Sequence, residues 1–153
     1  MATKKKKDKP IRIMTLDTET RGLEGAIFRA GLFDGRQYWA FDDIQDILQV
    51  IRNHSEKYVC HVYIHNADYD LSKFFQYIST DVDYSKSIFI NNVAVVIPLS
   101  HSIIFHCSYR LLPSSLEKLS IDFELEDEGK MSLDEVIKQQ GYKDKDDYFK
   151  RVP

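Results

Sequence analysis

The hydrophobic pattern changes its period along the chain, and this change constrains the possible folds more than any other feature. Residues 11–17, IRIMTLD, form a short apolar run rich in β-branched side chains, and strand-like runs follow at 25–34 and 37–42. From 42 to 57 the apolar residues recur at every third or fourth position, which is typical of an amphipathic helix. The pattern therefore predicts hairpin strands first and strand–helix alternation after them.

The rest of the chain continues this alternation. We expect strands at 58–65, 87–90, 93–98 and 102–107, helices at 71–78, 114–119 and 132–140, and an acidic loop at 122–128. Such a series predicts an α/β domain with a mixed β-sheet, although it leaves the order of the strands open. Because the sequence holds no internal repeat and no interdomain linker, we expect one domain over residues 11–153.

The length and the charge of the chain exclude some classes of function. With 153 residues the chain has room for one domain, which excludes a complete template-copying polymerase or a two-domain dehydrogenase. Five lysines and one aspartate give residues 1–10 a charge of +4, so the other 143 residues carry −7. We predict that this basic tail is a disordered, solubilising arm, and the alternative is an arm that contacts nucleic-acid phosphates.

No segment of the sequence is suited to a membrane. No apolar run follows the N-terminal lysines, so the tail is no secretory signal, and no stretch of roughly 18 apolar residues occurs. Cys60 and Cys107 lie in strand-like runs and are expected to be buried, reduced thiols. We therefore expect a cytoplasmic protein with no membrane partner.

Acidic residues lie where strands and helices end. Asp17 and Glu19 close the first strand two positions apart, so their carboxylates share a face. Asp70 follows the strand 58–65 at the start of the second helix. Three carboxylates that converge from two strand ends would form a hard, negative pocket suited to Mg²⁺ or Mn²⁺. Each also has a structural explanation, because an Asp-x-Glu pair occurs by chance and Asp70 is a plausible helix N-cap.

The residues around these carboxylates suit a nucleotide. Asn66 and Tyr69 flank Asp70 and could hydrogen-bond to a nucleotide and stack on it. The segment 108–119, SYRLLPSSLEKL, combines hydroxyls, an aromatic ring and Arg110 after an apolar strand. Its Ser-Ser-x-Glu pattern also predicts the start of a helix.

Histidines offer a second possible metal site. His61 and His65 share a face of one strand, as in a zinc pair, but no Cys or further His follows at a helpful spacing. We therefore expect His65 to form a hydrogen bond near the HNADYD segment instead. His54, His101 and His106 are expected at the surface or at sheet edges.

Three segments in this order, LDTET, HNADYD and SYRLLPSSLEKL, resemble the 3′→5′ exonuclease domain of family-B DNA polymerases. The similarity is greatest to the protein-primed branch of phages and linear plasmids, and it runs from about residue 11 to about residue 133. It implies a ribonuclease-H-like fold, in which helices flank a central mixed β-sheet. It also implies a bacterial host that is phage-infected or carries a plasmid.

The resemblance assigns metal binding to the three carboxylates. Asp17 and Glu19 match the first exonuclease motif, and Asp70 matches the second. In this family such carboxylates hold two Mg²⁺ or Mn²⁺ ions. Lys130 resembles a lysine of the family that assists catalysis.

The resemblance also assigns residues that hold the 3′ end of single-stranded DNA. Thr20, Asn66 and Tyr69 match three such positions. Ser108 matches a fourth, and Tyr109 stands beside it where the family usually has leucine. An aromatic ring at that position would be suited to stack on an unpaired base.

The third exonuclease motif of the family is Tyr-x-x-x-Asp on a helix. Tyr142 and Asp146 have this spacing, which would make both catalytic and Asp146 a metal ligand. In the alternative alignment, residues 141–143 are a loop before the motif helix. Either Tyr148 is then the motif tyrosine, with Val152 in place of the carboxylate, or the motif lies beyond Pro153. The domain would then be truncated before its last motif.

Together these features predict hydrolysis of terminal nucleotides from single-stranded DNA with the help of two metal ions. The alternative is an incomplete exonuclease-fold module that binds DNA or protein, with a polymerase remainder or a priming protein as its partner. A related nuclease that acts on RNA is a third hypothesis, because no residue that reads a 2′-hydroxyl can be named.

Overall fold

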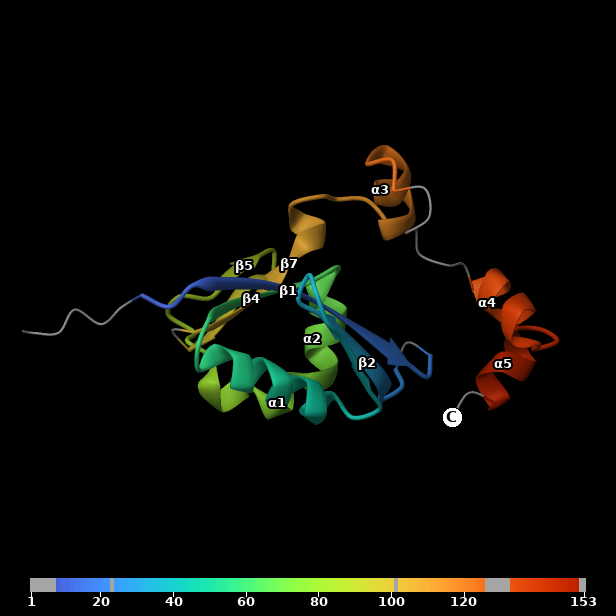
Figure 1. The fold of residues 1–153 in the computed structure, drawn as a ribbon, viewed down its shortest axis with the longest axis horizontal. Helices are drawn as coiled ribbons and strands as arrows, with labels where there is room; N and C mark the ends of the chain where they lie inside the picture. The colour runs from blue at the N-terminus through green and yellow to red at the C-terminus, as the bar shows by residue number, and fades with distance from the viewer. Residues whose placement is uncertain (1–7, 23, 101, 126–132, 152–153) are drawn as a thin grey trace, which may run out of the picture.

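The computed structural model describes residues 8–22, 24–100, 102–125 and 133–151 (Figure 1). Its strands are β1 (Ile11–Thr20), β2 (Ile27–Phe33), β3 (Tyr38–Phe41), β4 (Val59–Ile64), β5 (Ile88–Ile90), β6 (Val93–Ser100) and β7 (Ile103–Cys107). Its α-helices are α1 (Ile44–Ser55), α2 (Ala67–Phe74), α3 (Leu116–Asp122), α4 (Leu133–Gln140) and α5 (Lys145–Arg151). Short 3-10 turns cover Phe75–Tyr77, Ser79–Asp81 and Ser108–Arg110. Every predicted strand and helix is therefore present, with shifts at the ends.

The strands form one mixed seven-stranded sheet in the order β3-β2-β1-β4-β7-β6-β5. β1 pairs in parallel with β4, and β4 pairs in parallel with β7, whereas the other neighbours are antiparallel. The carboxyl ends of these three parallel strands therefore meet at one edge of the sheet. In open α/β sheets this edge is where ligands bind.

Helix α1 shows how the sequence determines local structure. The Asp43 carboxylate caps this helix by accepting a hydrogen bond from the Gln45 N–H at 2.9 Å. The buried side chains of the helix recur on one face and are Ile44, Ile47, Leu48 and Ile51. This is the amphipathic face that the periodicity predicts.

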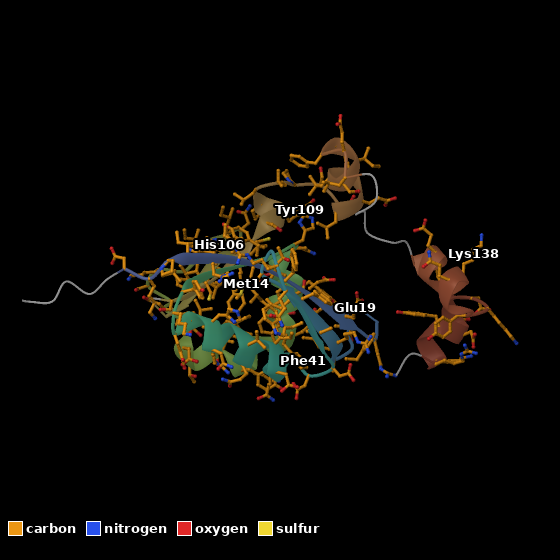
Figure 2. All side chains as sticks on the ribbon, in the orientation of Figure 1. Met14, Glu19, Phe41, His106, Tyr109 and Lys138 are labelled. Carbon is orange, nitrogen blue, oxygen red and sulfur yellow. The ribbon has the colours of Figure 1, made fainter. Side chains whose placement is uncertain are left out.

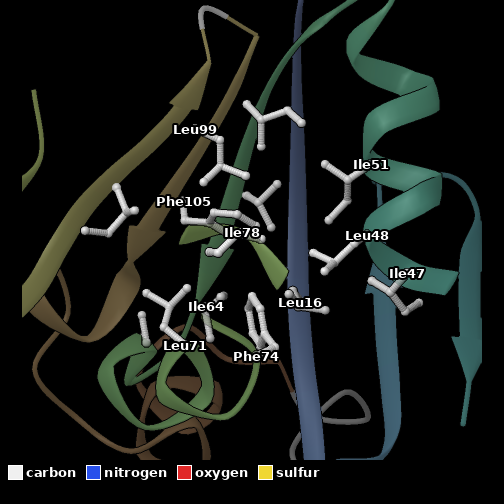
Figure 3. Packing of buried hydrophobic residues seen from close by; sticks show 14 of the residues in the cluster. Leu16, Ile47, Leu48, Ile51, Ile64, Leu71, Phe74, Ile78, Leu99 and Phe105 are labelled. Atoms are coloured by element: carbon white, nitrogen blue, oxygen red, sulfur yellow. The ribbon is translucent and has the colours of Figure 1, made fainter. Parts of the chain in front are cut away.

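One face of the sheet carries the hydrophobic core (Figure 3). Helices α1 and α2 cover this face, and Leu16 and Phe74 are among its buried side chains. Along β1, Leu16 and Thr18 point into this covered face, whereas Asp17 and Glu19 are exposed on the opposite side. We call that opposite side the open face, because among the described residues its side chains on β1 stay exposed.

Two helices have other bounds than predicted. The second helix begins at Ala67, because the left-handed backbone of Asn66, with φ 59°, ends β4 and turns the chain into α2. It changes to a 3-10 turn at Phe75. Helix α3 runs to Asp122 and takes in the start of the predicted acidic loop, whose residues 126–128 lie outside the described residues.

Helices α4 and α5 form a hairpin that stands apart from the sheet in Figure 1. The Tyr142 N–H donates to the Ile137 carbonyl at 3.0 Å, and Gly141, with φ 74°, ends α4. In the part of the chain that the structure describes, the core cluster of the sheet takes no side chain from this hairpin. The single domain predicted for residues 11–153 stays a prediction.

The predicted basic tail is described only from Asp8 onward. Lys9 donates to the Ser55 carbonyl at 2.7 Å and to the Ser102 hydroxyl at 3.0 Å. The chain therefore enters β1 beside the end of α1, at the opposite end of the strand from Glu19. Whether residues 1–7 contact phosphates stays a prediction.

Two smaller predictions concern cysteines and membranes. Cys60 and Cys107 are buried and free, as predicted. None of the described helices is long and apolar enough to cross a lipid bilayer.

Candidate active site at the carboxyl end of strand β1

The end of β1 presents its polar side chains on both faces of the sheet. Asp17 and Glu19 lie on the open face, as their spacing predicts. Thr18, between them, is buried on the covered face. Figure 2 shows Glu19 on the part of the strand that leads away from the core helices. The two exposed carboxylates can therefore reach a ligand that arrives from solvent.

A cleft of about 700 Å³ opens beside these two carboxylates on the open face. Its lining is mainly apolar and includes Asp17, Glu19 and Ser108. His65, at the end of β4, and Leu116, at the start of α3, form part of the same wall. The structure thus brings three of the predicted site residues to one cleft, although they come from two distant parts of the chain.

Asp70 lies in the first turn of α2 and is almost fully buried, with 5% of its surface exposed. Its carboxylate accepts a hydrogen bond from the Thr18 hydroxyl. Burial raises the pKa of the Asp70 carboxyl to about 6, the Thr18 hydrogen bond lowers it, and the nearby charge of Asp17 raises it. Asp70 therefore lies close enough to Asp17 for their charges to interact, but on the covered side of β1.

Two of the predicted substrate-binding residues are in contact. The Thr20 and Tyr69 hydroxyls are 2.7 Å apart, and Thr20 also donates to the Gly22 carbonyl at 2.8 Å. The Lys73 ammonium lies 5.2 Å from the centre of the Tyr69 ring. This cluster joins the end of β1 to α2 at the same edge of the sheet as Asp17.

Asn66 connects β4 to α2. Its side chain is exposed and forms no hydrogen bond that caps the helix. The positive φ of its backbone, one that asparagine tolerates better than most residues, is therefore the structural reason for asparagine here. Its exposed amide remains available to a ligand at this edge.

His65 forms hydrogen bonds near the second motif, as predicted. The Nδ1 atom of its ring lies 3.2 Å from the Ser108 hydroxyl oxygen. The Nε2 atom donates a hydrogen bond to the Ser114 carbonyl at 2.8 Å. The edge of the ring also contacts Tyr109, at 5.4 Å between ring centres. His65 therefore positions Ser108 and Tyr109 beside the cleft.

Two further predicted residues, Tyr142 and Asp146, lie away from this cluster in the structure. Lys130 lies outside the described residues. Tyr142 packs its ring against Tyr148, at 5.2 Å, and under Arg151, at 4.8 Å. Asp146 lies in the first turn of α5, on the hairpin that stands apart from the sheet (Figure 1). Residues 141–143 precede helix α5, which begins at Lys145, and which of the two alignments holds stays a prediction.

The metal prediction can be compared with the positions of the carboxylates. Across the described ranges, no three His, Cys, Asp or Glu side chains are grouped closely enough to hold a metal ion. Asp17 and Glu19 are nevertheless exposed oxygen donors on one face, which is the donor chemistry that a hard divalent cation requires. A cation would also offset the repulsion between Asp17 and Asp70. These two carboxylates are of the donor type that suits Mg²⁺ or Mn²⁺, and the binding of two such ions stays a prediction.

His61 pairs with a histidine of the neighbouring strand β7. His61 bonds to His106, with 2.9 Å between ring nitrogens, and the His106 ring stacks on Tyr63 at 4.6 Å. Burial lowers the pKa of His106, and the charge of His61 acts in the same direction. His106 is thus part of a packed ring cluster, which the sequence could not reveal because the pairing of β4 with β7 was unknown.

Sequence reasoning also missed an aromatic part of the cleft. Phe33 and Tyr38, from the β2–β3 hairpin, line it together with Gly31. The alternation of Phe33 with buried Leu32 was the available signal for its orientation. The register that brings this hairpin beside Asp17 was not available from the sequence.

Comparison with known proteins identifies a similar fold. The structure matches phi29 DNA polymerase complexed with primer-template DNA and incoming nucleotides, with a TM-score of 0.64 and 14% identity over 81% of this chain and 25% of that chain. It also matches phi29 DNA polymerase complexed with single-stranded DNA, with a TM-score of 0.64 and 14% identity over 88% of this chain and 26% of that chain. No protein-family model and no curated protein matches the sequence.

This likeness shows a shared fold with part of a DNA polymerase. The chain spans about a quarter of the length of the polymerase that it matches. The mixed seven-stranded sheet with flanking helices confirms the predicted α/β class and is consistent with a ribonuclease-H-like fold.

Proposed function

We propose that this chain is a metal-dependent 3′→5′ exonuclease domain that removes terminal nucleotides from single-stranded DNA. The observation that carries the proposal is the meeting of Asp17, Glu19 and Ser108 in one cleft, with Asp70 at the same strand end. The three segments that supply these residues are those that resemble the exonuclease motifs. A fold shared with part of phi29 DNA polymerase supports the same reading.

Asp17 and Glu19 would hold the divalent ions, and Asp70, buried on the other side of β1, would contribute through its charge. Bound Mg²⁺ or Mn²⁺ would activate water as the nucleophile and stabilise charge on the phosphate. The protein itself contributes the positions of the carboxylates. Asp17 and Glu19 are set on one face by strand geometry, and Asp70 is held by the hydroxyl of Thr18.

The end of the DNA strand would be held by hydroxyls and rings beside these carboxylates. The Thr20–Tyr69 pair offers hydroxyls that can hydrogen-bond to a sugar or phosphate. Tyr109 offers a ring for an unpaired base, and His65 fixes the loop that carries it. Because base faces are accessible only when unpaired, this arrangement favours single strands over duplex.

The test compares two double variants that remove two carboxylates each. Asp17→Asn with Glu19→Gln should abolish Mn²⁺-dependent shortening of single-stranded DNA, because it removes both cleft carboxylates. The matched control is Asp46→Asn with Glu56→Gln, which changes two exposed acids on or beside α1 and should keep the wild-type rate. Electrophoresis of a labelled oligonucleotide measures both, and equal rates for wild type and the cleft variant would refute the proposal.

A second candidate function is an exonuclease-fold module that binds DNA or protein without hydrolysis. The observation in its favour is that Tyr142 and Asp146 lie on the α4–α5 hairpin rather than beside Asp17. Calorimetric titration with Mn²⁺ separates the two candidates when combined with the activity assay. Metal binding with hydrolysis supports the enzyme, whereas DNA binding without hydrolysis in Mn²⁺ supports the module.

A further inference from the structure

Two large aromatic side chains are exposed on the open face beside the candidate site. Tyr38 has 64% of its surface exposed and Phe33 has 44%. Phe33 pairs with Thr15 on one side and with Tyr38 on the other, so the three form one row across β1, β2 and β3. Exposed aromatic rings in adjacent positions of a sheet are unusual unless something covers them.

The Tyr38 ring lies directly over Gly31 of strand β2. A Cβ atom added to Gly31 would collide with the Tyr38 hydroxyl, and it would also press on the ring itself. Gly31 is the direct cross-strand partner of Asp17. The Tyr38 ring therefore leans across β2 towards Asp17, and glycine is the residue that leaves room for it. We call Gly31, Phe33 and Tyr38 the aromatic platform.

The cleft beside the platform continues along the sheet into a second hollow. Both hollows are lined by Ile13, Thr15 and Phe33, so they adjoin on the open face, and we call the two together the groove. The groove runs from the carboxylates of Asp17 and Glu19 to Arg36, and Arg12, whose position in β1 belongs to the covered side, lines its far end as well. Arg12 is paired with Asp34 at 3.5 Å, and Arg36 is exposed.

We infer that the aromatic platform binds an unpaired base of a single-stranded nucleic acid whose backbone continues along the groove towards Arg36. A single-stranded nucleic acid has planar bases that can stack on the aromatic rings. It also has phosphates that can pair with the guanidinium group of Arg36. The direction rests on the proposed function, because it sets the 3′ end at Asp17 and Glu19. An amphipathic helix would match the apolar side chains but has no phosphate for the guanidinium group of Arg36.

The binding test uses a chain that cannot cleave its probe. Every platform variant is built on Asp17→Asn with Glu19→Gln, and fluorescence anisotropy follows a 5′-labelled oligothymidylate without divalent ions. Tyr38→Ala should weaken binding about ten-fold or more, because one stacked base is lost. Tyr38→Phe keeps the ring and should bind as the parent does. Tyr84→Ala is the control, since Tyr84 is 59% exposed outside the groove.

Gly31→Ala provides a second variant that does not remove a ring. The added methyl group displaces the Tyr38 ring, so binding should weaken when Tyr38 is present. In the Tyr38→Ala background the same change should have almost no further effect, because the ring is already gone. Arg36→Gln should lower the slope of log affinity against log salt by about 0.7, the value for one phosphate contact to a single strand.

Three results would overturn this inference. The first is a parent chain that does not bind the probe, and the second is parent-like binding by correctly folded Tyr38→Ala and Phe33→Ala variants. The third is a dimer, measured by light scattering, that Tyr38→Ala dissociates without changing DNA binding, which would make the platform a protein interface. Failure of the proposed function would give a different result. The wild-type chain would then not hydrolyse DNA, although binding of DNA would still depend on the aromatic platform.

Discussion

Hydroxyl groups join strand β1 to helix α2 in the candidate site. Thr18 donates to Asp70, and the Thr20 and Tyr69 hydroxyls meet at 2.7 Å, so β1 and α2 are connected on both sides of Glu19. The first contact satisfies a buried carboxyl. The second lies where a DNA end would be bound, and a hydrogen bond there orders the groups that receive the ligand.

Tyr69→Phe tests this second contact. The change keeps the ring near Lys73 and removes the hydroxyl that meets Thr20, so the rate at low DNA concentration should fall about two- to ten-fold. The melting temperature should change little, because the pair is only partly buried. Steady-state kinetics with single-stranded DNA measures the effect.

Tyr84→Phe is the matched control, since it removes a hydroxyl that bonds to the Ser79 carbonyl far from the cleft. It should leave the kinetics unchanged. A Tyr69→Phe enzyme with unaltered kinetics would show that the hydroxyl does not take part in binding.

Individual residues differ in how much of their role the sequence reveals. Asp17 and Glu19 share a face because side chains alternate in any strand, so their placement follows from spacing alone. The contacts of Thr18 with Asp70 and of Tyr38 with Gly31 depend on which elements pack together. That packing is a tertiary property, and local patterns do not contain it.

The β2–β3 hairpin is the element that positions the aromatic platform. Its turn is held by the Asp34 carboxylate, which accepts hydrogen bonds from the N–H groups of Arg36 at 2.9 Å and Gln37 at 2.7 Å. These backbone hydrogen bonds, with that of Gln37 the largest, lower the pKa of Asp34, and the charge of Arg12 acts in the same direction. The turn is therefore stabilised by the ionised form of Asp34.

Asp34→Ala should lower the free energy of unfolding by about 1–3 kcal/mol at neutral pH, because it leaves two backbone N–H groups without this acceptor. The folded-state pKa of Asp34 lies below its ordinary value of 3.8, so its contribution is fully present above that value. It is lost as the pH falls through the lowered pKa. Urea unfolding at pH 7 and at about pH 2 should therefore show a difference from wild type that shrinks in acid.

The opposite trend would contradict this account of the turn. A difference between wild type and Asp34→Ala that grows as the pH falls would mean that the protonated carboxyl is the stabilising form.

Element boundaries show the same division between local and tertiary information. Helix α1 has the predicted amphipathic face and an N-cap at Asp43, both of which are local signals. The His61–His106 pair requires β4 and β7 to be parallel neighbours, and strands that are nearly 40 residues apart along the chain give no local sign of this.

The whole molecule has one sheet face covered by helices and one face that carries the chemistry. Helices α1 and α2 pack on the covered face, while the open face holds Asp17, Glu19 and the aromatic platform. The fold class followed from the order of strand and helix patterns. The position of the α4–α5 hairpin did not follow from these patterns. Its two helices pack on each other, and their sequences do not indicate which other surface they would contact.

A time course of single-stranded DNA hydrolysis by the full chain in Mn²⁺ tests the proposed exonuclease activity most directly. The oligonucleotide carries a label at its 5′ end, and the products are sized by electrophoresis and identified by mass spectrometry. We expect labelled products that shorten stepwise from the 3′ end with release of mononucleotides, and no reaction after chelation of the metal. Intact DNA in Mn²⁺, or products cut at internal positions, would contradict it.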